Sequence, residues 1–169
     1  MNFFKYFFIF LFISLMSCSD NKNYPMTKLD KKIPVNFNLQ KIDGTFFSLE
    51  ELKGSYVLVN FWATWCKPCV REMPALNNLS KIYSNKDNFK VIAINIGQKT
   101  NIVDNFLQKI GGVDFLILLD EEMNLSEWDV QAIPTTFLVD KEGIIIFSAQ
   151  GEREWDSEEF TLFIDSLLE

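Results

Sequence analysis

Two cysteines separated by two residues are the side chains in this sequence best placed to do chemistry. They are Cys66 and Cys69, in the segment Trp65-Cys66-Lys67-Pro68-Cys69. At this spacing the two sulfurs can close a disulfide, and one thiolate can attack a disulfide of another molecule while the second resolves the mixed disulfide. The same spacing also supplies half of many zinc sites. The other residues of the sequence are therefore needed to distinguish redox chemistry from metal binding.

The residue inventory argues against a metal site. A zinc ion held within one chain needs four Cys or His ligands, and the sequence has three cysteines and no histidine. Two chains could share a zinc ion through four thiolates, and two thiolates could hold Cu(I). The absence of histidine also excludes Ser-His-Asp and Cys-His hydrolases. We therefore expect no metal and no cofactor, and interpret the pair as redox-active.

Charge and composition exclude another class of function. The 169 residues carry a net charge of −7 without a basic run, which is a poor basis for binding nucleic acid. Hydrophobic residues make up 48% of the chain, enough for one globular domain with a core.

The position of the pair gives its two cysteines different chemistry. The apolar run from Tyr56 to Trp62 predicts a buried strand, and Pro68 suits the first turn of a helix that follows at once. Cys66 would then lie exposed at the helix N-terminus, where free backbone N–H groups lower a thiol pKa. Cys69, one turn further in, would be shielded.

Further strands and helices alternate along the chain and predict an α/β fold, a central mixed sheet with helices on both faces. The strands are expected as a hairpin over 37–47, strands at 91–96 and 115–119, and a second hairpin over 135–148. The helices are expected after Ser48 and ending at Gly54, over 68–83, from a cap at Thr100 or Asn101 to Ile110, over 124–130, and after a cap in 156–159.

The N-terminal residues resemble an export signal. A short basic start precedes an apolar run that ends at Ser17-Cys18, and this run is too short for a membrane-spanning helix. Leu15-Met16-Ser17-Cys18 resembles the lipobox of bacterial lipoproteins. We expect a signal peptide at 1–17, lipidated Cys18, a flexible tether over 18–34 and a folded domain over 35–169; an uncleaved N-terminal anchor is the alternative. Lipidation would also account for the odd cysteine.

Two motifs resemble the extracytoplasmic thioredoxin-like proteins of the TlpA/ResA type. They are residues 59–74 (VNFWATWCKPCVREMP) and residues 132–140 (AIPTTFLVD). The resemblance spans about residues 34–168. It implies a thioredoxin fold with an N-terminal β-hairpin extension and a central αβ insertion, and it implies activity as a thiol–disulfide oxidoreductase.

The resemblance also implies roles for single residues. It makes Cys66 the nucleophile, Cys69 the resolving thiol and their bond the redox-active disulfide. It makes Pro134 a cis-proline, with the backbone of Ile133 facing the disulfide and open to an extended substrate segment; an ordinary trans proline is the alternative.

The resemblance and the residue types also suggest roles for residues next to the cysteine pair. Trp65 flanks the sulfur as contact surface, and Lys67 and Pro68 set the local charge and the helix start. Trp62 suits either contact or core packing.

Glu72 lies one helical turn after Cys69. Taken alone it would be a solvated helix carboxylate, but the resemblance makes it a partly buried acid that adjusts the thiol pKa values and accepts a proton. Cytoplasmic thioredoxins have an acid where this chain has Asn60, so we hypothesise that Glu72 supplies the missing base.

The expected function is a membrane-anchored, periplasmic reductase of disulfides in exported proteins, with apocytochrome c as one candidate substrate. The expected partners are those substrates and a membrane thiol donor of the DsbD/CcdA type. A disulfide-forming oxidant or isomerase would use the same residues in reverse, because redox direction depends on the potential rather than the fold. A Cu(I)-binding module is the alternative from another class.

Overall fold

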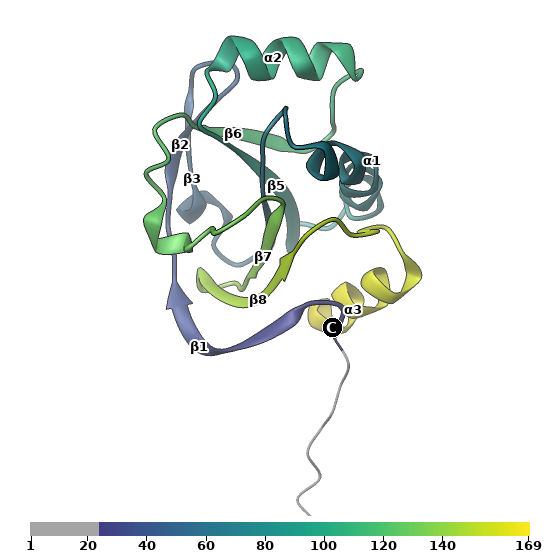
Figure 1. The fold of residues 1–169 in the computed structure, drawn as a ribbon. Helices are drawn as coiled ribbons and strands as arrows, with labels where there is room; N and C mark the ends of the chain where they lie inside the picture. Colours follow the sequence, from purple (N-terminus) through teal and green to yellow (C-terminus); the bar gives the residue numbers. More distant parts are fainter. Residues whose placement is uncertain (1–23) are drawn as a thin grey trace, which may run out of the picture.

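The computed structural model describes residues 24–169, which build one mixed sheet of eight strands in the order β1-β8-β7-β4-β5-β6-β2-β3 (Figure 1). The strands are β1 Thr27–Pro34, β2 Asn38–Lys41, β3 Phe46–Ser48, β4 Tyr56–Trp62, β5 Phe89–Ile96, β6 Leu116–Asp120, β7 Thr135–Val139 and β8 Ile144–Gln150. The α-helices are α1 Lys67–Ile82, α2 Thr100–Lys109 and α3 Glu158–Leu168, and the 3-10 helices are η1 Leu49–Leu52 and η2 Ser126–Trp128. The expected α/β class with a central mixed sheet is confirmed.

Strand β4 is the centre of the sheet and leads directly to the cysteines. It pairs in parallel with β5 on one side and antiparallel with β7 on the other. Six of its seven residues are buried, as its continuous apolar sequence predicts for a strand covered on both faces. Helix α1 begins five residues after β4 ends, with Cys66 as its N-cap and Pro68 in its first turn.

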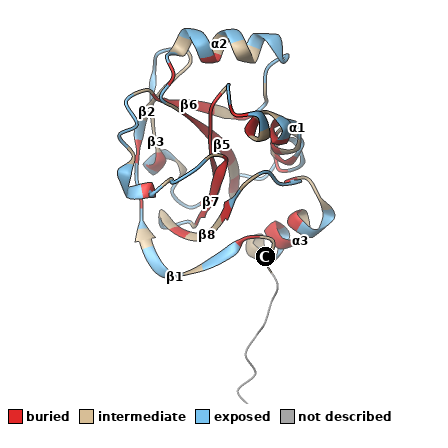
Figure 2. Ribbon diagram, viewed as in Figure 1, coloured by how far each residue is buried: buried red, intermediate tan, exposed pale blue. Residues whose placement is uncertain are grey.

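The two faces of the sheet are covered unequally (Figure 2). The sequence predicts helices on both faces, but all three α-helices pack on one of them, through residues such as Leu76, Val103 and Phe163. The opposite face is covered by the hairpin region and the 3-10 helices, through Leu49 and Trp128. The cysteine pair belongs to the α-helical face.

Several local predictions are confirmed. Strands β2 and β3 form the expected hairpin, and Ser48 and Glu51 form the expected capping box before η1. The last helix is capped by Ser157, whose side chain accepts a hydrogen bond from Phe160 N–H. Gly54 follows η1 with a φ of 91°, a conformation that favours glycine.

Two predicted helix boundaries are wrong. Neither Thr100 nor Asn101 caps α2, because the N-cap is Lys99 and the Glu121 carboxylate accepts hydrogen bonds from the Thr100 N–H and hydroxyl. The helix expected over 124–130 is reduced to the three residues of η2, after which Asp129 adopts a left-handed conformation. Both differences come from tertiary contacts or backbone geometry that a local pattern does not encode.

The expected flexible tether over 18–34 is wrong for its second half. Thr27–Pro34 forms β1, which pairs antiparallel with β8 at the edge of the sheet. Tyr24 packs edge-on against Phe147 and Phe163, with ring centroids 5.0 and 5.7 Å apart. The polar sequence of β1 hid the strand because an edge strand buries little side-chain surface. The expected signal peptide and Cys18 lie outside the described residues.

Substitution of Met26 tests whether this segment is part of the fold. Its side chain is 4% exposed within the core cluster of the helical face, so Met26→Ala should lower the free energy of unfolding by about 2 kcal/mol or more. Urea denaturation of the oxidised protein measures this. Lys31→Ala, at an exposed position of strand β1, which begins directly after Met26, should change it by less than about 0.5 kcal/mol. Negligible effects of both substitutions would favour the flexible tether instead.

Candidate active site

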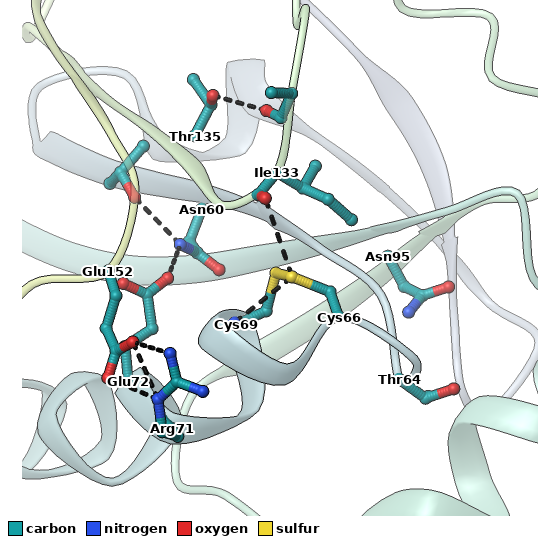
Figure 3. The surroundings of a disulfide bond; sticks show 12 residues. Asn60, Thr64, Cys66, Cys69, Arg71, Glu72, Asn95, Ile133, Thr135 and Glu152 are labelled. Carbon is teal, nitrogen blue, oxygen red and sulfur yellow. Dashed lines mark hydrogen bonds and ion pairs between the residues drawn. A yellow bond between two sulfur atoms is a disulfide. The ribbon is translucent and has the colours of Figure 1, made fainter.

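The two cysteines lie at the N-terminus of α1 and are joined in a disulfide, with their Cα atoms 5.3 Å apart (Figure 3). The N–H of Cys69 donates a hydrogen bond to Sγ of Cys66 at 3.3 Å. A thiolate at Cys66 would keep this donor and would feel the positive end of the helix dipole, so the geometry favours the charged form of that sulfur.

The expected exposure of Cys66 is wrong. Cys66 is 5% exposed and Cys69 is 1% exposed, so both sulfurs are largely covered. One cause is the loop before β7, because the carbonyl oxygen of Ile133 lies 3.7 Å from Sγ of Cys66.

The loop before β7 has the predicted conformation. The Ile133–Pro134 peptide bond is cis. The carbonyl of Pro134 accepts a hydrogen bond from the N–H of Gly151 at 2.8 Å, and the Thr135 hydroxyl donates to the carbonyl of Ala132 at 2.6 Å. The loop is therefore tied to Gly151, directly after β8, and to itself, which fixes the Ile133 backbone beside the disulfide.

Glu72 is the buried polar group of this site. It is 1% exposed, more buried than the partly buried acid that the sequence predicts. Its Oε1 accepts a hydrogen bond from Asn60 Nδ2 at 2.8 Å, and its Oε2 accepts from the Arg153 backbone N–H at 3.1 Å and from Trp155 Nε1 at 3.0 Å. Asn60 also donates to the hydroxyl of Thr136 at 2.9 Å. The carboxylate thus joins α1, β4 and the segment between β8 and α3.

Burial and hydrogen bonding have opposite effects on Glu72. Removal from water raises the pKa of the Glu72 carboxyl above its usual value, whereas the donors of Trp155, Asn60 and Arg153 lower it; burial is the larger effect, so the pKa is raised overall. A buried carboxyl with a raised pKa keeps its proton to higher pH than a solvent-exposed glutamate does.

The remaining predicted site residues divide into surface and core. Trp65 is 68% exposed, beside Cys66 in the sequence, while Trp62 is fully buried in the core. Lys67 is exposed and Pro68 is half-buried in the first turn of α1. Contact with another molecule at Trp65 and Lys67 is therefore sterically open, and for Trp62 the structure favours core packing.

Sequence reasoning missed the partners that surround the centre. Trp155 packs against Phe160 of the last helix, with ring centroids 5.0 Å apart, and its indole N–H donates a hydrogen bond to Glu72. On the other side of the disulfide, Gln98 accepts a hydrogen bond from the backbone N–H of Thr64. Both partners are distant in sequence and carry no motif, so no local signal pointed to them.

The raised pKa of Glu72 predicts a pH-dependent stability. An unfolded glutamate ionises near pH 4.5, while the folded carboxyl ionises at higher pH. Between these values the folded state binds the extra proton, so stability present below pH 4.5 is lost as pH rises through the folded pKa. Gln cannot ionise, so Glu72→Gln should not lose this stability. The unfolding free energy of the variant minus that of the wild type should therefore increase as pH rises in this window.

Urea denaturation of the oxidised protein across pH 4 to 8, about the range in which such carboxyls titrate, measures the difference. Glu159→Gln is the matched control, because Glu159 is exposed on α3 and its substitution should leave the pH profile unchanged. A constant difference between Glu72→Gln and the wild type would contradict a raised pKa.

Comparison with known proteins agrees with this geometry. The Redoxin family matches residues 28–162. "Thiol-disulfide oxidoreductase ResA" of Bacillus subtilis is 38% identical over 117 residues, which are 69% of this chain and 64% of that protein. "Thioredoxin-like protein YneN" of the same organism is 38% identical over 112 residues, 65% of each chain. The chain thus spans slightly less than two thirds of the length of these relatives.

Solved structures show the same fold. A putative thiol:disulfide interchange protein DsbE from Chlorobium tepidum superposes with a TM-score of 0.72 at 29% identity, covering 87% of this chain and all of that one. StoA from Bacillus subtilis gives a TM-score of 0.62 at 28% identity, covering 72% of this chain and 91% of that one. Sequence match, fold and the disulfide at the N-terminus of α1 agree, and this chain belongs to the redoxin family.

Proposed function

We propose that this chain is a thiol–disulfide oxidoreductase that reduces disulfides of exported proteins through Cys66 and Cys69. The observation that carries the proposal is the disulfide at the N-terminus of α1, with the Cys69 N–H directed at the Cys66 sulfur. The similarity to ResA supports the same activity.

In this proposal Cys66 is the nucleophile and Cys69 the resolving thiol. The Cys66 thiolate attacks one sulfur of a substrate disulfide, forming a mixed disulfide and releasing the other substrate sulfur, which takes up a proton. Cys69 loses its proton and attacks Sγ of Cys66, which breaks the mixed disulfide and releases the second substrate thiol. Two electrons pass to the substrate, and the protein is left with the Cys66–Cys69 disulfide.

Glu72 is proposed to accept the proton that Cys69 loses. It is buried one helical turn from Cys69, and burial raises the pKa of its carboxyl. Asn60 cannot act as a base, but its amide donates to Glu72 and so orients the carboxylate. This is consistent with the hypothesis that Glu72 replaces the acid missing at Asn60.

Substrate is proposed to bind along the loop before β7. The Ile133 backbone lies against Cys66, and an extended segment could pair with it as an added strand. Pro134 completes the loop, while Trp65, Lys67 and Pro68 would supply the adjoining contact surface. The exposed indole of Trp65 suits contact with an unfolded or extended polypeptide.

The location is proposed from the N-terminal sequence, and the partners from the resemblance to TlpA/ResA-type proteins. Lipidated Cys18 would anchor the domain to a membrane on the periplasmic side, where a thiol donor of the DsbD/CcdA type would reduce the disulfide again after each turnover. Apocytochrome c is a candidate substrate. No helix within residues 24–169 has the length and hydropathy to cross a membrane.

Insulin reduction with a thiol donor tests the activity. The wild type should accelerate it, and Cys66→Ser should abolish the acceleration. Cys69→Ser should accumulate a mixed disulfide on Cys66, visible by nonreducing electrophoresis and mass spectrometry, because the resolving step is lost. A wild type without activity, or a measured potential near about −120 mV as in strong oxidants, would overturn the assignment as a reductase.

The same assay tests Glu72. Glu72→Gln should alter the pH dependence of the exchange rate because the variant has no titrating carboxyl beside the thiols. An unchanged pH profile would contradict a role in proton transfer.

Removal of Cys18 tests the membrane anchor. Full-length protein with Cys18→Ala should leave the membrane fraction or remain as uncleaved precursor, and mass spectrometry should no longer detect a lipid-modified N-terminus. Insulin reduction by the purified variant should be unchanged, since the cysteine pair is intact. Recovery of unmodified wild-type protein would support the uncleaved anchor instead.

A further inference from the structure

A second polar cluster lies on the side of the disulfide opposite Glu72, and its members are Thr64, Asn95 and Gln98. Figure 3 shows Thr64 and Asn95 on one side of the cysteines with Glu72 and Asn60 on the other. Gln98 Oε1 accepts hydrogen bonds from the Thr64 backbone N–H at 2.8 Å and from Asn95 Nδ2 at 3.1 Å, and Gln98 Nε2 donates to the Thr64 hydroxyl at 2.9 Å.

The orientation of the Gln98 amide is determined by these contacts. Its oxygen faces two N–H donors, so the nitrogen must face the Thr64 hydroxyl. Asn95 is fully buried and Gln98 is 8% exposed. Hydrogen bonds shielded from water are costly to leave unmade, so the three bonds of Gln98 should keep its amide in one orientation. Asn95 Oδ1 accepts no hydrogen bond among the described residues, so Asn95 joins the cluster through its Nδ2 alone.

Gln98 is itself held by a well-braced loop. It lies between β5 and α2, where Gly97 N–H donates to the carbonyl of Asp120 at 2.9 Å. Thr100, two residues after Gln98, donates hydrogen bonds from its N–H and its hydroxyl to the Glu121 carboxylate. The loop is thus fixed to the end of β6, which belongs to the central αβ insertion.

Thr64 connects this cluster to the reactive sulfur. It lies two residues before Cys66, in the short loop between β4 and α1, where the Cys66 N–H donates to the Ala63 carbonyl at 3.1 Å. Gln98 binds Thr64 through both its backbone and its side chain, so it restrains the direction in which the chain enters α1. That direction determines how the Cys69 N–H meets the Cys66 sulfur.

We propose that Gln98 is a positioning residue for the Cys66 thiolate. Its side chain holds the loop before α1 through Thr64, and Asn95 helps to orient its amide. The inference rests on the proposed function and extends it, since it assigns part of the thiol's reactivity to the αβ insertion. Gln98 acts through Thr64 and touches neither sulfur in this scheme.

The test measures the pH dependence of Cys66 alkylation in the reduced protein. Gln98→Met keeps the approximate side-chain volume but removes both polar atoms, so the loop loses its restraint and the thiolate is stabilised less well. The alkylation rate at neutral pH should fall by roughly threefold to tenfold, with the profile displaced to higher pH. A variant that is only less stable would melt at lower temperature and keep the wild-type profile, which would overturn the proposal.

A double-mutant cycle connects the effect to Thr64. Thr64→Val replaces the hydroxyl with a methyl group and should displace the alkylation profile to higher pH, by less than Gln98→Met does. Thr64→Ser keeps a hydroxyl and should retain the wild-type profile. The double variant Thr64→Val/Gln98→Met should match Gln98→Met alone, because the hydroxyl acts through Gln98. Additive effects would contradict the proposal, and if Gln98→Met does not fold, the Val and Ser pair decides the question.

Two controls separate this inference from the function on which it rests. Gln108→Met changes an exposed glutamine of α2 whose side chain hydrogen-bonds only to Asp104 among the described residues, and it should leave the profile unchanged. If the wild type fails to reduce insulin, the proposed function fails. If the wild type reduces insulin while Gln98→Met keeps the wild-type alkylation profile, the positioning role alone is rejected.

Discussion

The buried carboxylate of Glu72 is the constraint on which the arrangement of the site depends. An ionised carboxylate away from water is tolerated only if it is hydrogen-bonded. Here its donors come from β4 and from the segment between β8 and α3. Any packing of α1 that buried Glu72 without these donors would leave the charge unsatisfied. The carboxylate therefore selects one position of α1 on the sheet, and with it the position of both cysteines.

The loop that carries Cys66 is then restrained from two sides. Glu72 fixes the helix that follows the loop, and Gln98 holds the loop itself through Thr64. In the proposed function the Glu72 contact serves proton exchange, and in the further inference the Gln98 contact serves the geometry of the thiolate. A reactive thiolate needs both, because a helix N-terminus stabilises charge only if its N–H groups point at the sulfur.

The sequence allowed every strand except β1, the three α-helices and the cysteine pair to be predicted, because each has a local signature. The apolar run of β4 and the helix start at Pro68 follow from patterns within one segment. Asn60 could be recognised as a departure, but its bond to Glu72 could not, since it depends on how α1 packs. Strand β1 was missed for a related reason, because its polar residues gain order by pairing with β8 rather than by burial.

Strand register explains how such distant residues meet. Phe61 lies opposite Thr135 in the antiparallel pair of β4 and β7, which brings the Ile133–Pro134 loop beside the cysteine loop. Trp62 lies opposite Asn95 in the parallel pair of β4 and β5, which brings Gln98 to the other side. A slip of one residue in either pair would turn the facing side chains to the opposite face of the sheet. Apart from Asn60, the buried β4 sequence is apolar on both faces. Specific contacts must therefore prevent such a slip, and the hydrogen bonds of Asn60 to Glu72 and Thr136 are among them. The polar network around Glu72 therefore helps to fix the register that brings the residues of the site together.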